Sequence, residues 1–410
     1  MRPDTVLATN TSSLSVTAIA AGLALAHRTA GLHFFNPVPL MKVVEVIAGI
    51  RTTTEVCAAL VACSGHIGHT PLRAADTPGF IVHHAGRGYG TEAMRLVGEG
   101  VCDFGSTDQI LRDQVGFKLG PVAWMDLTRL DNRSWRGSMA SITTSHVVGP
   151  ARSPRNASPA ARSVASLANV SNAMRKERGR CQLSQCLPIP DELQPVWVSP
   201  RAARRPQLLQ LPTDLGATTE STQTPSAAAL ILLAPLGFDV TTMAVVERLD
   251  PTRTIGIDLL VDDACTRRRV LATNPATRSD MRRAAAALMA GDGKAVSVIR
   301  DSGGFVTQRV VAMIVNIACD MCQQGVCSAA DLKMASQLGL AHPLEPLETG
   351  STFGPPNILK VLFNMQTVSG DPRYRLGRLS GLGLEPNPQP DSLLARVAPA
   401  WRDRPEPAAR

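Results

Sequence analysis

Two residues of one short stretch, His33 and Glu45, have the types and spacing to act as an acid–base pair. The stretch runs from Ala30 to Gly49 and places His33 at the end of an apolar run. A turn with Pro37 and Pro39 follows, and Glu45 then lies inside a second, β-branched run. We predict that two neighbouring strands present the imidazole and the carboxylate.

The chemistry open to such a pair is removal of a proton from a carbon-bound hydroxyl near neutral pH. Histidine is the usual base for this step because its pKa lies close to the working pH. A carboxylate on the other ring nitrogen fixes the tautomer and stabilises the imidazolium as it forms. A spacing of twelve residues leaves a second interpretation open, in which His33 is satisfied by backbone and Glu45 lies on a solvated strand face.

Three segments together resemble the L-3-hydroxyacyl-CoA dehydrogenase family. They are ATNTSSL (Ala8 to Leu14), GLHFFNPVPLMKVVEV (Gly31 to Val46) and DTPGFIV (Asp76 to Val82), and they stand in that family's order and spacing. The resemblance covers about residues 5 to 130. It implies a dinucleotide-binding domain followed by a helical domain, and an enzyme that moves a hydride between NAD and C3 of a hydroxyacyl-CoA.

The resemblance also implies a role for each matching residue. His33 would be the general base, and Glu45 would orient it. Ser12 and the side chain of His83 would hold the substrate oxygen. Asn10 would lie near the nicotinamide end of the NAD cofactor, and acyl-CoA would be the substrate.

The chain departs from the family pattern in two places. His83 stands where the family has asparagine and His84 where it usually has arginine, so we expect impaired chemistry. In addition, no G-x-G-x-x-G turn, which holds the pyrophosphate at a helix N-terminus, precedes Asn10. We interpret the chain as an N-terminally truncated member. The alternative function is a non-catalytic remnant or a helical dimerisation module.

The net charge of +8 and the pI near 9.2 come from one segment. Between Arg133 and Pro212, twelve Lys or Arg stand against three acidic residues, so the rest of the chain is close to neutral. This segment lacks the interleaved aromatic residues of a nucleic-acid-binding surface and the amphipathic helix of a membrane-surface segment. We therefore expect neither nucleic acid nor a membrane as a partner.

The nine cysteines are scattered and odd in number, which is typical of reduced thiols in a cytoplasmic protein. Cys319 and Cys322 have a C-x-x-C spacing, with Cys327 nearby, but they lie in a helical pattern without a second ligand pair, so we predict no metal. The run from Ser226 to Val246 is interrupted by Pro, Gly and Asp, which argues against a membrane span.

The first 75 residues read as the second half of a dinucleotide-binding domain. Apolar periodicity predicts strands at 5–9, 30–35, 43–47 and 71–75 and helices at 16–26 and 54–64. The turn Asp76 to Phe80 then opens a long helix through Leu96. Residues 76–135 are expected to form a first, incomplete helical dehydrogenase domain.

Residues 136–225 show no sustained helical or strand period and are rich in Arg, Ser, Pro and Ala, with Trp197 as their only aromatic. We interpret them as a basic, low-order linker. Two explanations stay open, a disordered insertion and a stretch read out of frame.

Order returns after residue 225, with a degenerate nucleotide-fold remnant at 226–300 and a second helical dehydrogenase domain at 301–377. Strands are expected at 230–233, 254–260 and 294–299, and a helix at 278–289. The DSGGFV turn at Asp301 repeats DTPGFI at Asp76, and Gly325-Val326-Cys327 repeats Gly100-Val101-Cys102, which indicates an internal duplication. We expect residues 378–410 to be a disordered tail.

The predicted fold class is thus α/β plus all-α: the C-terminal half of a Rossmann-like NAD domain, two helical domains and a disordered central tract. Tandem helical domains resemble bacterial two-domain members of the family, including those of phenylacetate catabolism. The implied function is NAD-dependent oxidation of (S)-3-hydroxyacyl-CoA to 3-oxoacyl-CoA in fatty-acid β-oxidation or phenylacetate degradation. The resemblance also implies a homodimer through the helical domains.

Overall fold

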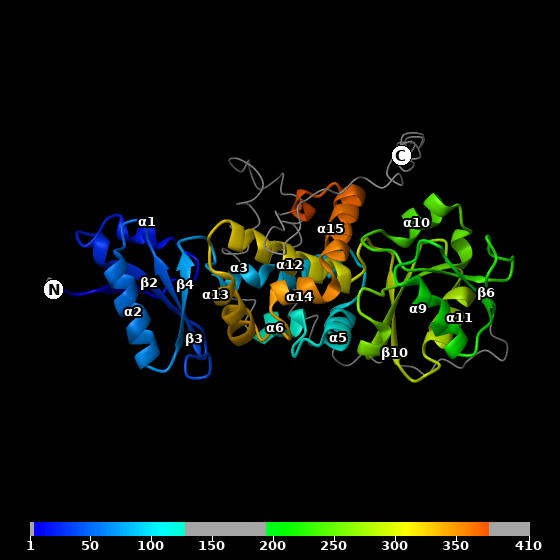
Figure 1. The fold of residues 1–410 in the computed structure, drawn as a ribbon, viewed down its shortest axis with the longest axis horizontal. Helices are drawn as coiled ribbons and strands as arrows, with labels where there is room; N and C mark the ends of the chain where they lie inside the picture. The colour runs from blue at the N-terminus through cyan, green and yellow to red at the C-terminus, as the bar shows by residue number, and fades with distance from the viewer. Residues whose placement is uncertain (1–3, 128–193, 377–410) are drawn as a thin grey trace.

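The computed structural model describes residues 4–127 and 194–376, and these form an elongated molecule with an α/β sheet at each end. Helices fill the space between the two sheets (Figure 1). The predicted combination of Rossmann-like α/β sheets and a helical region is confirmed.

The first sheet has four strands in the order β1-β2-β3-β4. The β1–β2 and β3–β4 pairs are parallel, whereas β2 and β3 run antiparallel. Buried Val and Ile of β3 explain the strand, because β-branched side chains pack well on a pleated surface. The strands are β1 (Leu7–Thr9), β2 (Thr29–Phe34), β3 (Val43–Ala48) and β4 (Thr70–Ala75).

The helix expected at 16–26 is shorter than predicted. Helix α1 (Val16–Ala20) ends before Gly22, and a 3-10 turn, η1 (Ala26–Arg28), leads into β2. Glycine favours helix ends because it has a low helix propensity, and Leu23 is 40% exposed, so it adds no buried face that would continue the helix. Helix α2 (Thr54–His66) covers the sheet, with Val56 and Leu60 buried.

The long helix expected after the Asp76 turn is broken into α3 (Val82–Ala85) and α4 (Arg87–Gly98). The break falls at Gly86, where an added Cβ would lie 3.2 Å from the side chain of Leu340. The two helices therefore separate at a glycine that packs against the C-terminal half of the chain.

The second sheet has six strands in the order β10-β9-β8-β7-β5-β6. All neighbouring pairs are parallel except β8 and β9. Helices α9 (Arg205–Asp214), α10 (Val240–Glu247) and α11 (Ser279–Met289) belong to this unit. The strands are β5 (Val196–Val198), β6 (Thr219–Glu220), β7 (Leu230–Leu233), β8 (Thr254–Ile257), β9 (Arg268–Thr273) and β10 (Ala295–Arg300).

The prediction of a low-order segment at 136–225 is wrong for residues 194–225, which form β5, α9 and β6. Trp197 is 3% exposed, and its indole nitrogen donates to the backbone oxygen of Thr222 at 2.9 Å. Strands of two and three residues are too short to show a period, and α9 opens with Arg205 and Pro206, so the pattern carried no signal. Residues 136–193 lie outside the described part of the chain.

Strand β9 was also missed, because it begins with two arginines. Arg269 is 2% exposed, and its guanidinium bonds the carboxylates of Asp263 and Asp292 at 2.7–2.8 Å. Arg268 donates to Asp113 at 2.9 Å. Buried cations are found in proteins when they are paired in this way. Hydropathy alone would place both arginines in solvent, and for this reason it does not predict the strand.

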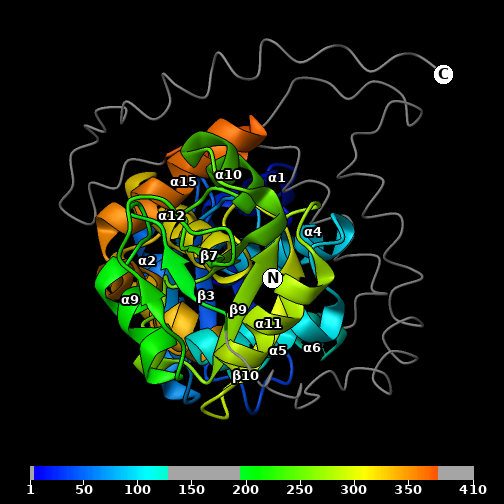
Figure 2. The same cartoon turned by 90° about the vertical axis from the view of Figure 1, so that its right-hand side faces the viewer.

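The helical region between the sheets is organised around α12 (Thr307–Gln323), which packs against α4 and α15 (Pro355–Ser369). Viewed along the long axis, α12 lies near the middle of the molecule behind the second sheet (Figure 2). The other elements of this region are α5 (Phe104–Val115), α6 (Pro121–Leu127), α13 (Ala329–Met334), the π-helix η5 (Ala335–Gly339), α14 (Pro346–Phe353) and η6 (Pro372–Tyr374).

A buried ionic network joins α4 to α12. The guanidinium of Arg309 donates to Glu92 at 2.7 Å and to both carboxylate oxygens of Glu99 at 2.7 and 2.9 Å. The hydroxyl of Tyr374 donates to Glu92 at 2.9 Å. The side chains of Arg309 and Glu92 are 4% and 0% exposed, so this network holds the two helices together through charges removed from water.

Each sheet also bonds to the helical segment that is distant from it in sequence. The backbone nitrogen of Ala75, in β4, donates to Val326, in the turn after α12, at 2.9 Å. Likewise Arg300, in β10, donates to Val101, in the turn after α4, at 2.9 Å. The two halves of the chain therefore cross over, and each makes a backbone hydrogen bond to the edge strand of the other half's sheet.

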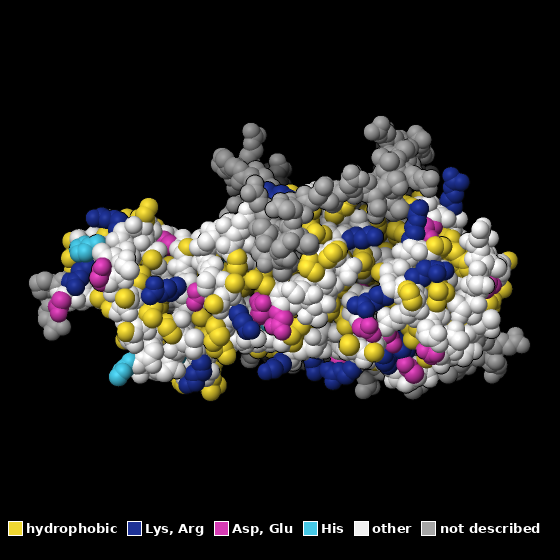
Figure 3. Space-filling model, in the orientation of Figure 1, with side chains coloured by type: hydrophobic (Ala, Val, Ile, Leu, Met, Phe, Trp, Pro, Cys, Tyr) yellow, Lys and Arg dark blue, Asp and Glu magenta, His cyan; other side chains and the backbone are white. Residues whose placement is uncertain are grey.

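The first sheet unit exposes more large apolar side chains than the rest of the described chain. Hydrophobic atoms are spread over this lobe in the space-filling view (Figure 3). Strand β1 is at the open edge of the sheet, and such edges are surfaces for further pairing. The exposed apolar residues of this unit are Leu14, Ile19, Leu23, Val38, Leu40, Ile50 and Ile67.

Candidate functional site

His33 and Glu45 form a buried hydrogen-bonded pair at the centre of the first sheet. They are direct partners in the antiparallel β2–β3 ladder, which places their side chains on one face of the sheet. The distance from His33 Nδ1 to Glu45 Oε2 is 2.7 Å, and the residues are 3% and 0% exposed. The predicted pairing from neighbouring strands is confirmed, and the solvated-strand interpretation is wrong.

The second oxygen of Glu45 fixes the carboxylate against the neighbouring helix. Glu45 Oε1 accepts hydrogen bonds from the backbone nitrogens of Ile81 and Val82 at 2.9 and 2.8 Å. These N–H groups open α3 and have no partner within the helix. Both carboxylate oxygens are thus used, and the imidazole of His33 is held in one orientation.

Aromatic rings enclose His33. The ring centroid of Phe35 lies 4.4 Å from that of His33, Phe80 lies at 5.9 Å and His83 at 5.6 Å. Within the described residues, His33 Nε2 has no hydrogen-bond partner. The nitrogen opposite the carboxylate is therefore available to a ligand, while the surrounding rings keep the site apolar.

The turn from Asp76 to Phe80 places His83 beside His33. Gly79 has φ +84° and Phe80 has φ +46°, both in the left-handed region. A Cβ on Gly79 would lie 3.3 Å from the Cβ of His83, so glycine permits the close approach. Burial lowers the pKa of His83, so the ring is neutral at pH 7. His84 is buried next to it.

Asn10 and Ser12 lie at and just beyond the carboxyl end of β1. Asn10 Oδ1 accepts from the backbone nitrogen of Phe34 at 2.8 Å, which ties β1 to the strand that carries His33. This bond leaves the amide Nδ2 of Asn10 as a donor at the rim of the sheet. Ser12 is exposed in the loop before α1.

Asp76 is a residue of the site region whose role the sequence reasoning missed. Its carboxylate accepts from Ser15 Oγ at 2.7 Å, Val16 N at 2.8 Å and Thr17 N at 2.7 Å. Burial raises its pKa, but the hydrogen bonds from Thr17, Ser15 and Val16 outweigh burial and hold the pKa below its usual value. Asp76 therefore caps α1 from sixty residues away and joins the Ser12 loop to the His83 turn.

A buried acid, Asp258, lies at the end of β8 in the second sheet. Its Oδ1 accepts from Gln308 Nε2 at 3.0 Å and from Leu260 N at 3.1 Å, whereas its buried Oδ2 has no hydrogen-bond partner among the described residues. Burial raises the pKa of Asp258 to about 6, against the smaller opposing effect of the Gln308 hydrogen bond. The folded protein thus binds this proton more tightly than the unfolded chain does.

Replacing Asp258 with asparagine is expected to raise the free energy of unfolding at pH 7 by about 1–3 kcal/mol. The folded-state pKa is above the unfolded value, so the contribution of Asp258 is fully present below about pH 4 and is lost as the pH rises through about 6. The free energy of unfolding of the variant should therefore be higher than that of the original chain at pH 7 and equal to it near pH 4. Urea denaturation at both pH values measures the difference.

Asp262→Asn is the matched control, because backbone and side-chain hydrogen bonds lower the pKa of Asp262. This exposed carboxylate should give no gain at pH 7. A gain of the same size in both variants would contradict the assignment to Asp258.

In the described part of the chain, no three His, Cys, Asp or Glu side chains are grouped so that they could hold a metal ion. The helices of these same residues include none with the length and apolar character needed to cross a bilayer.

Comparison with known families places both kinds of domain in one family. Residues 1–77 match the sequence profile of the 3-hydroxyacyl-CoA dehydrogenase NAD binding domain. Residues 79–151 and 304–381 match that of the 3-hydroxyacyl-CoA dehydrogenase C-terminal domain.

Individual relatives cover most of the chain. The 3-hydroxyadipyl-CoA dehydrogenase of Escherichia coli K12 is 31% identical over 386 residues, which span 91% of this chain and 73% of that protein. The crystal structure of 3-hydroxybutyryl-CoA dehydrogenase from Escherichia coli K12 is 29% identical with a TM-score of 0.68. That match covers 94% of this chain and 76% of the solved one.

Proposed function

Because this chain belongs to the 3-hydroxyacyl-CoA dehydrogenase family, we propose that its His33–Glu45 pair is the catalytic base of that reaction. The function is NAD-dependent oxidation of a 3-hydroxyacyl-CoA to the 3-oxoacyl-CoA. The observation that carries the proposal for His33 is its free Nε2, opposite a 2.7 Å bond to a fully buried carboxylate.

The mechanism assigns one task to each residue. His33 Nε2 takes the proton of the C3 hydroxyl, and Glu45 stabilises the imidazolium that forms. The hydroxyl of Ser12 and the neutral ring of His83 hold the substrate oxygen. Phe35 and Phe80 exclude water from the imidazole. NAD held near Asn10 would supply the acceptor for the hydride that leaves C3.

We propose that the nicotinamide end of NAD lies at the carboxyl end of β1. Ligands of open α/β sheets bind outside the carboxyl ends of the strands, where Asn10 offers its amide donor and Ser12 its hydroxyl. We propose Asn10 as the cofactor contact. The glycine-rich turn that would hold the pyrophosphate is not found before Asn10 in the printed sequence.

NADH consumption by the 410-residue chain with acetoacetyl-CoA tests this function. Slow turnover is expected, because the reverse reaction delivers a proton from His33 to the 3-oxo oxygen, whereas His83 in place of asparagine impairs the chemistry. Comparison of acetoacetyl-CoA with 3-oxoadipyl-CoA then identifies the substrate, since the two relatives are named for the 3-hydroxybutyryl and 3-hydroxyadipyl substrates. Folded protein without turnover on either compound would favour the non-catalytic remnant.

We further propose that the two halves are copies of one unit. Strands β3 and β9 start 225 residues apart, at 43 and 268, and β4 and β10 keep the same offset, at 70 and 295. Asp301 caps α10 through Val240 and Thr241 at 2.7 and 2.8 Å, as Asp76 caps α1. Phe305 has φ +49°, as Phe80 has +46°.

The residues at the corresponding positions of the second half explain why it carries no catalytic base. Asp258 stands at the position of His33, Val270 at that of Glu45, and Gln308 at that of His83. Gln308 bonds Asp258, the backbone nitrogen of Gly237 and the backbone oxygen of Pro235. The second site is therefore filled by its own side chains, and we propose that it does no chemistry.

We also propose a division into domains, a cellular compartment, an oligomeric state and a metabolic role. We divide the chain into a nucleotide-fold unit to residue 75, helical units at 76–135 and 301–377, and a second nucleotide-fold unit that ends at 300. The seven cysteines of the described residues are free thiols, which is consistent with a cytoplasmic protein. A homodimer and a place in fatty-acid or phenylacetate degradation are predicted by the family resemblance.

A further inference from the structure

A cavity of about 370 Å³ lies between the turn after α4 and the edge of the second sheet. Its size falls at the lower end of small-ligand sites, and such sites are common where units meet. None of its lining residues belongs to the first sheet, so it is separate from the His33 site. The walls are formed by Gly100, Val101, Cys102, Asp103, Thr273, Arg282, Val298, Ile299 and Arg300.

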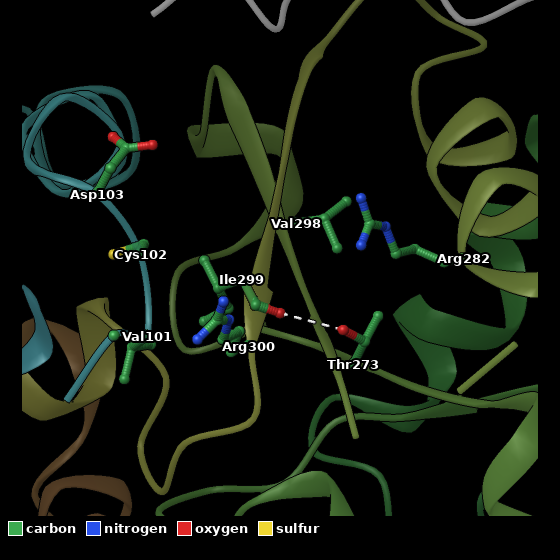
Figure 4. Close-up of a pocket in the computed structure, with 9 residues that line it drawn as sticks. Val101, Cys102, Asp103, Thr273, Arg282, Val298, Ile299 and Arg300 are labelled. Carbon is green, nitrogen blue, oxygen red and sulfur yellow. Dashed lines mark hydrogen bonds between the residues drawn. The ribbon is translucent and has the colours of Figure 1, made fainter. Parts of the chain in front are cut away.

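Two arginines approach this cavity from different elements. Arg282 extends from α11 toward Val298, and Arg300 lies beside Ile299, across from Val101 (Figure 4). Residues 298 and 300 point to the same face of β10, because side chains alternate along a strand. Val298 packs with the α11 residues of the second sheet's core, so the Arg300 side chain starts on the face that α11 covers. Its guanidinium then turns toward the turn after α4, where Nη1 lies 3.4 Å from the position of a Cβ on Gly100, so the two guanidinium groups stand at different sides of the cavity (Figure 4).

Neither arginine has an acidic partner. Within the described residues, the side chains of Arg282 and Arg300 make no hydrogen bond and no ion pair, whereas other arginines of this unit, such as Arg268 and Arg269, are paired. The acid on the cavity wall, Asp103, is used as the N-cap of α5, where it accepts from Ser106 N at 2.6 Å. Among the described residues, the cavity wall therefore carries two guanidinium groups against one carboxylate, which leaves a net positive charge.

The corresponding position in the first half lacks this charge. At the offset of 225 residues, Cys57 stands for Arg282 and Ala75 for Arg300, although the backbone contact of Ala75 with Val326 repeats that of Arg300 with Val101. The backbone contact is thus common to both halves, and the arginine pair is an addition in the second half alone.

We propose that this cavity binds a small phosphorylated molecule, whose phosphate oxygens Arg282 and Arg300 hold. A guanidinium group offers two parallel N–H donors that match a phosphate and stays charged at every physiological pH. A ligand held in this way joins the first helical unit to the second sheet. It thereby stabilises the crossed arrangement of the two halves, at a distance from the acyl-CoA site.

Isothermal titration calorimetry of the full chain with sodium pyrophosphate tests the proposal. Arg282→Gln and Arg300→Gln are each expected to raise the dissociation constant about tenfold or more, because each removes a charge-assisted contact. Both side chains are exposed, so the variants should keep the fold, which circular dichroism verifies. In parallel, pyrophosphate should raise the Tm of the original chain more than that of either variant.

Arg283→Gln is the control, because Arg283 is exposed on the same helix but does not line the cavity. It should bind pyrophosphate like the original chain. Equal affinity in all four proteins would mean general attraction to a basic chain and would overturn the site, as would the absence of binding. Succinate, a dicarboxylate, distinguishes the ligand class, and tighter binding of succinate than of pyrophosphate would refute the phosphate assignment.

Discussion

Replacing His33 with glutamine is expected to lower the rate of NADH-dependent reduction of acetoacetyl-CoA by about 10²–10⁴-fold. Glutamine keeps a polar side chain on β2 but cannot transfer a proton at neutral pH. The loss should appear in kcat, because the imidazole of His33 transfers the proton in the transition state. Steady-state kinetics at a fixed, saturating NADH concentration measure it.

The matched control is His69→Gln, in the same sheet unit. His69 is half-buried directly before β4, and its Nε2 lies 3.2 Å from the backbone oxygen of Val38. This variant should retain at least half of the original kcat. Similar rates for the His33 variant and the original chain would refute the base assignment, and equal loss in both variants would indicate damage to the sheet instead.

Replacing Arg309 with methionine is expected to lower the free energy of unfolding by about 3–5 kcal/mol. Methionine fills a similar volume, but it leaves Glu92 fully buried with the Tyr374 hydroxyl as its short contact and Arg373 3.7 Å away. An unpaired buried carboxylate is costly, because the desolvation penalty is no longer offset. Urea denaturation followed by circular dichroism measures the change.

A double-mutant cycle with Glu92→Gln separates charge from packing. If the network acts through charge, the double variant should be more stable than the sum of the single changes predicts, by at least 1 kcal/mol or so. Strict additivity would show that packing of α4 on α12, and not the ion pair, determines the loss. Arg283→Gln, on the exposed face of α11, is the control, and it should change the free energy of unfolding by about zero.

The parts of the fold that could be predicted depend on local patterns. The β2 and β3 strands could be predicted because each is a nearly continuous run dominated by apolar and β-branched residues, and the turn between them is marked by prolines. Their pairing also follows from proximity in sequence. The meeting of His33 and Glu45 was therefore within reach of sequence reasoning, although the 2.7 Å contact and the second bond of Glu45 to α3 were not.

The parts that could not be predicted depend on partners far away in sequence. Arg268 and Arg269 read as solvent-exposed, and they are buried because Asp113, Asp263 and Asp292 come to them in three dimensions. Strand β5 is three residues long, and its Trp197 is recognisable as core only once Thr222 lies beside it. Asp76 read as a turn residue, since nothing local shows that it caps a helix sixty residues earlier.

Because the two halves cross over, helix α4 leaves the ribosome well before the helix against which it packs, α12, has been synthesised. The contact between Arg309 and Glu92 spans 217 residues, so at roughly 5–20 residues per second helix α4 waits roughly 10–40 s for its partner to be made. During that time the face of α4 that later packs against α12 has no cover from the C-terminal half. We expect this uncovered face to favour chaperone binding and association of the nascent chain. Synonymous changes that slow translation between α4 and α12 should therefore lower the soluble yield without altering the protein itself.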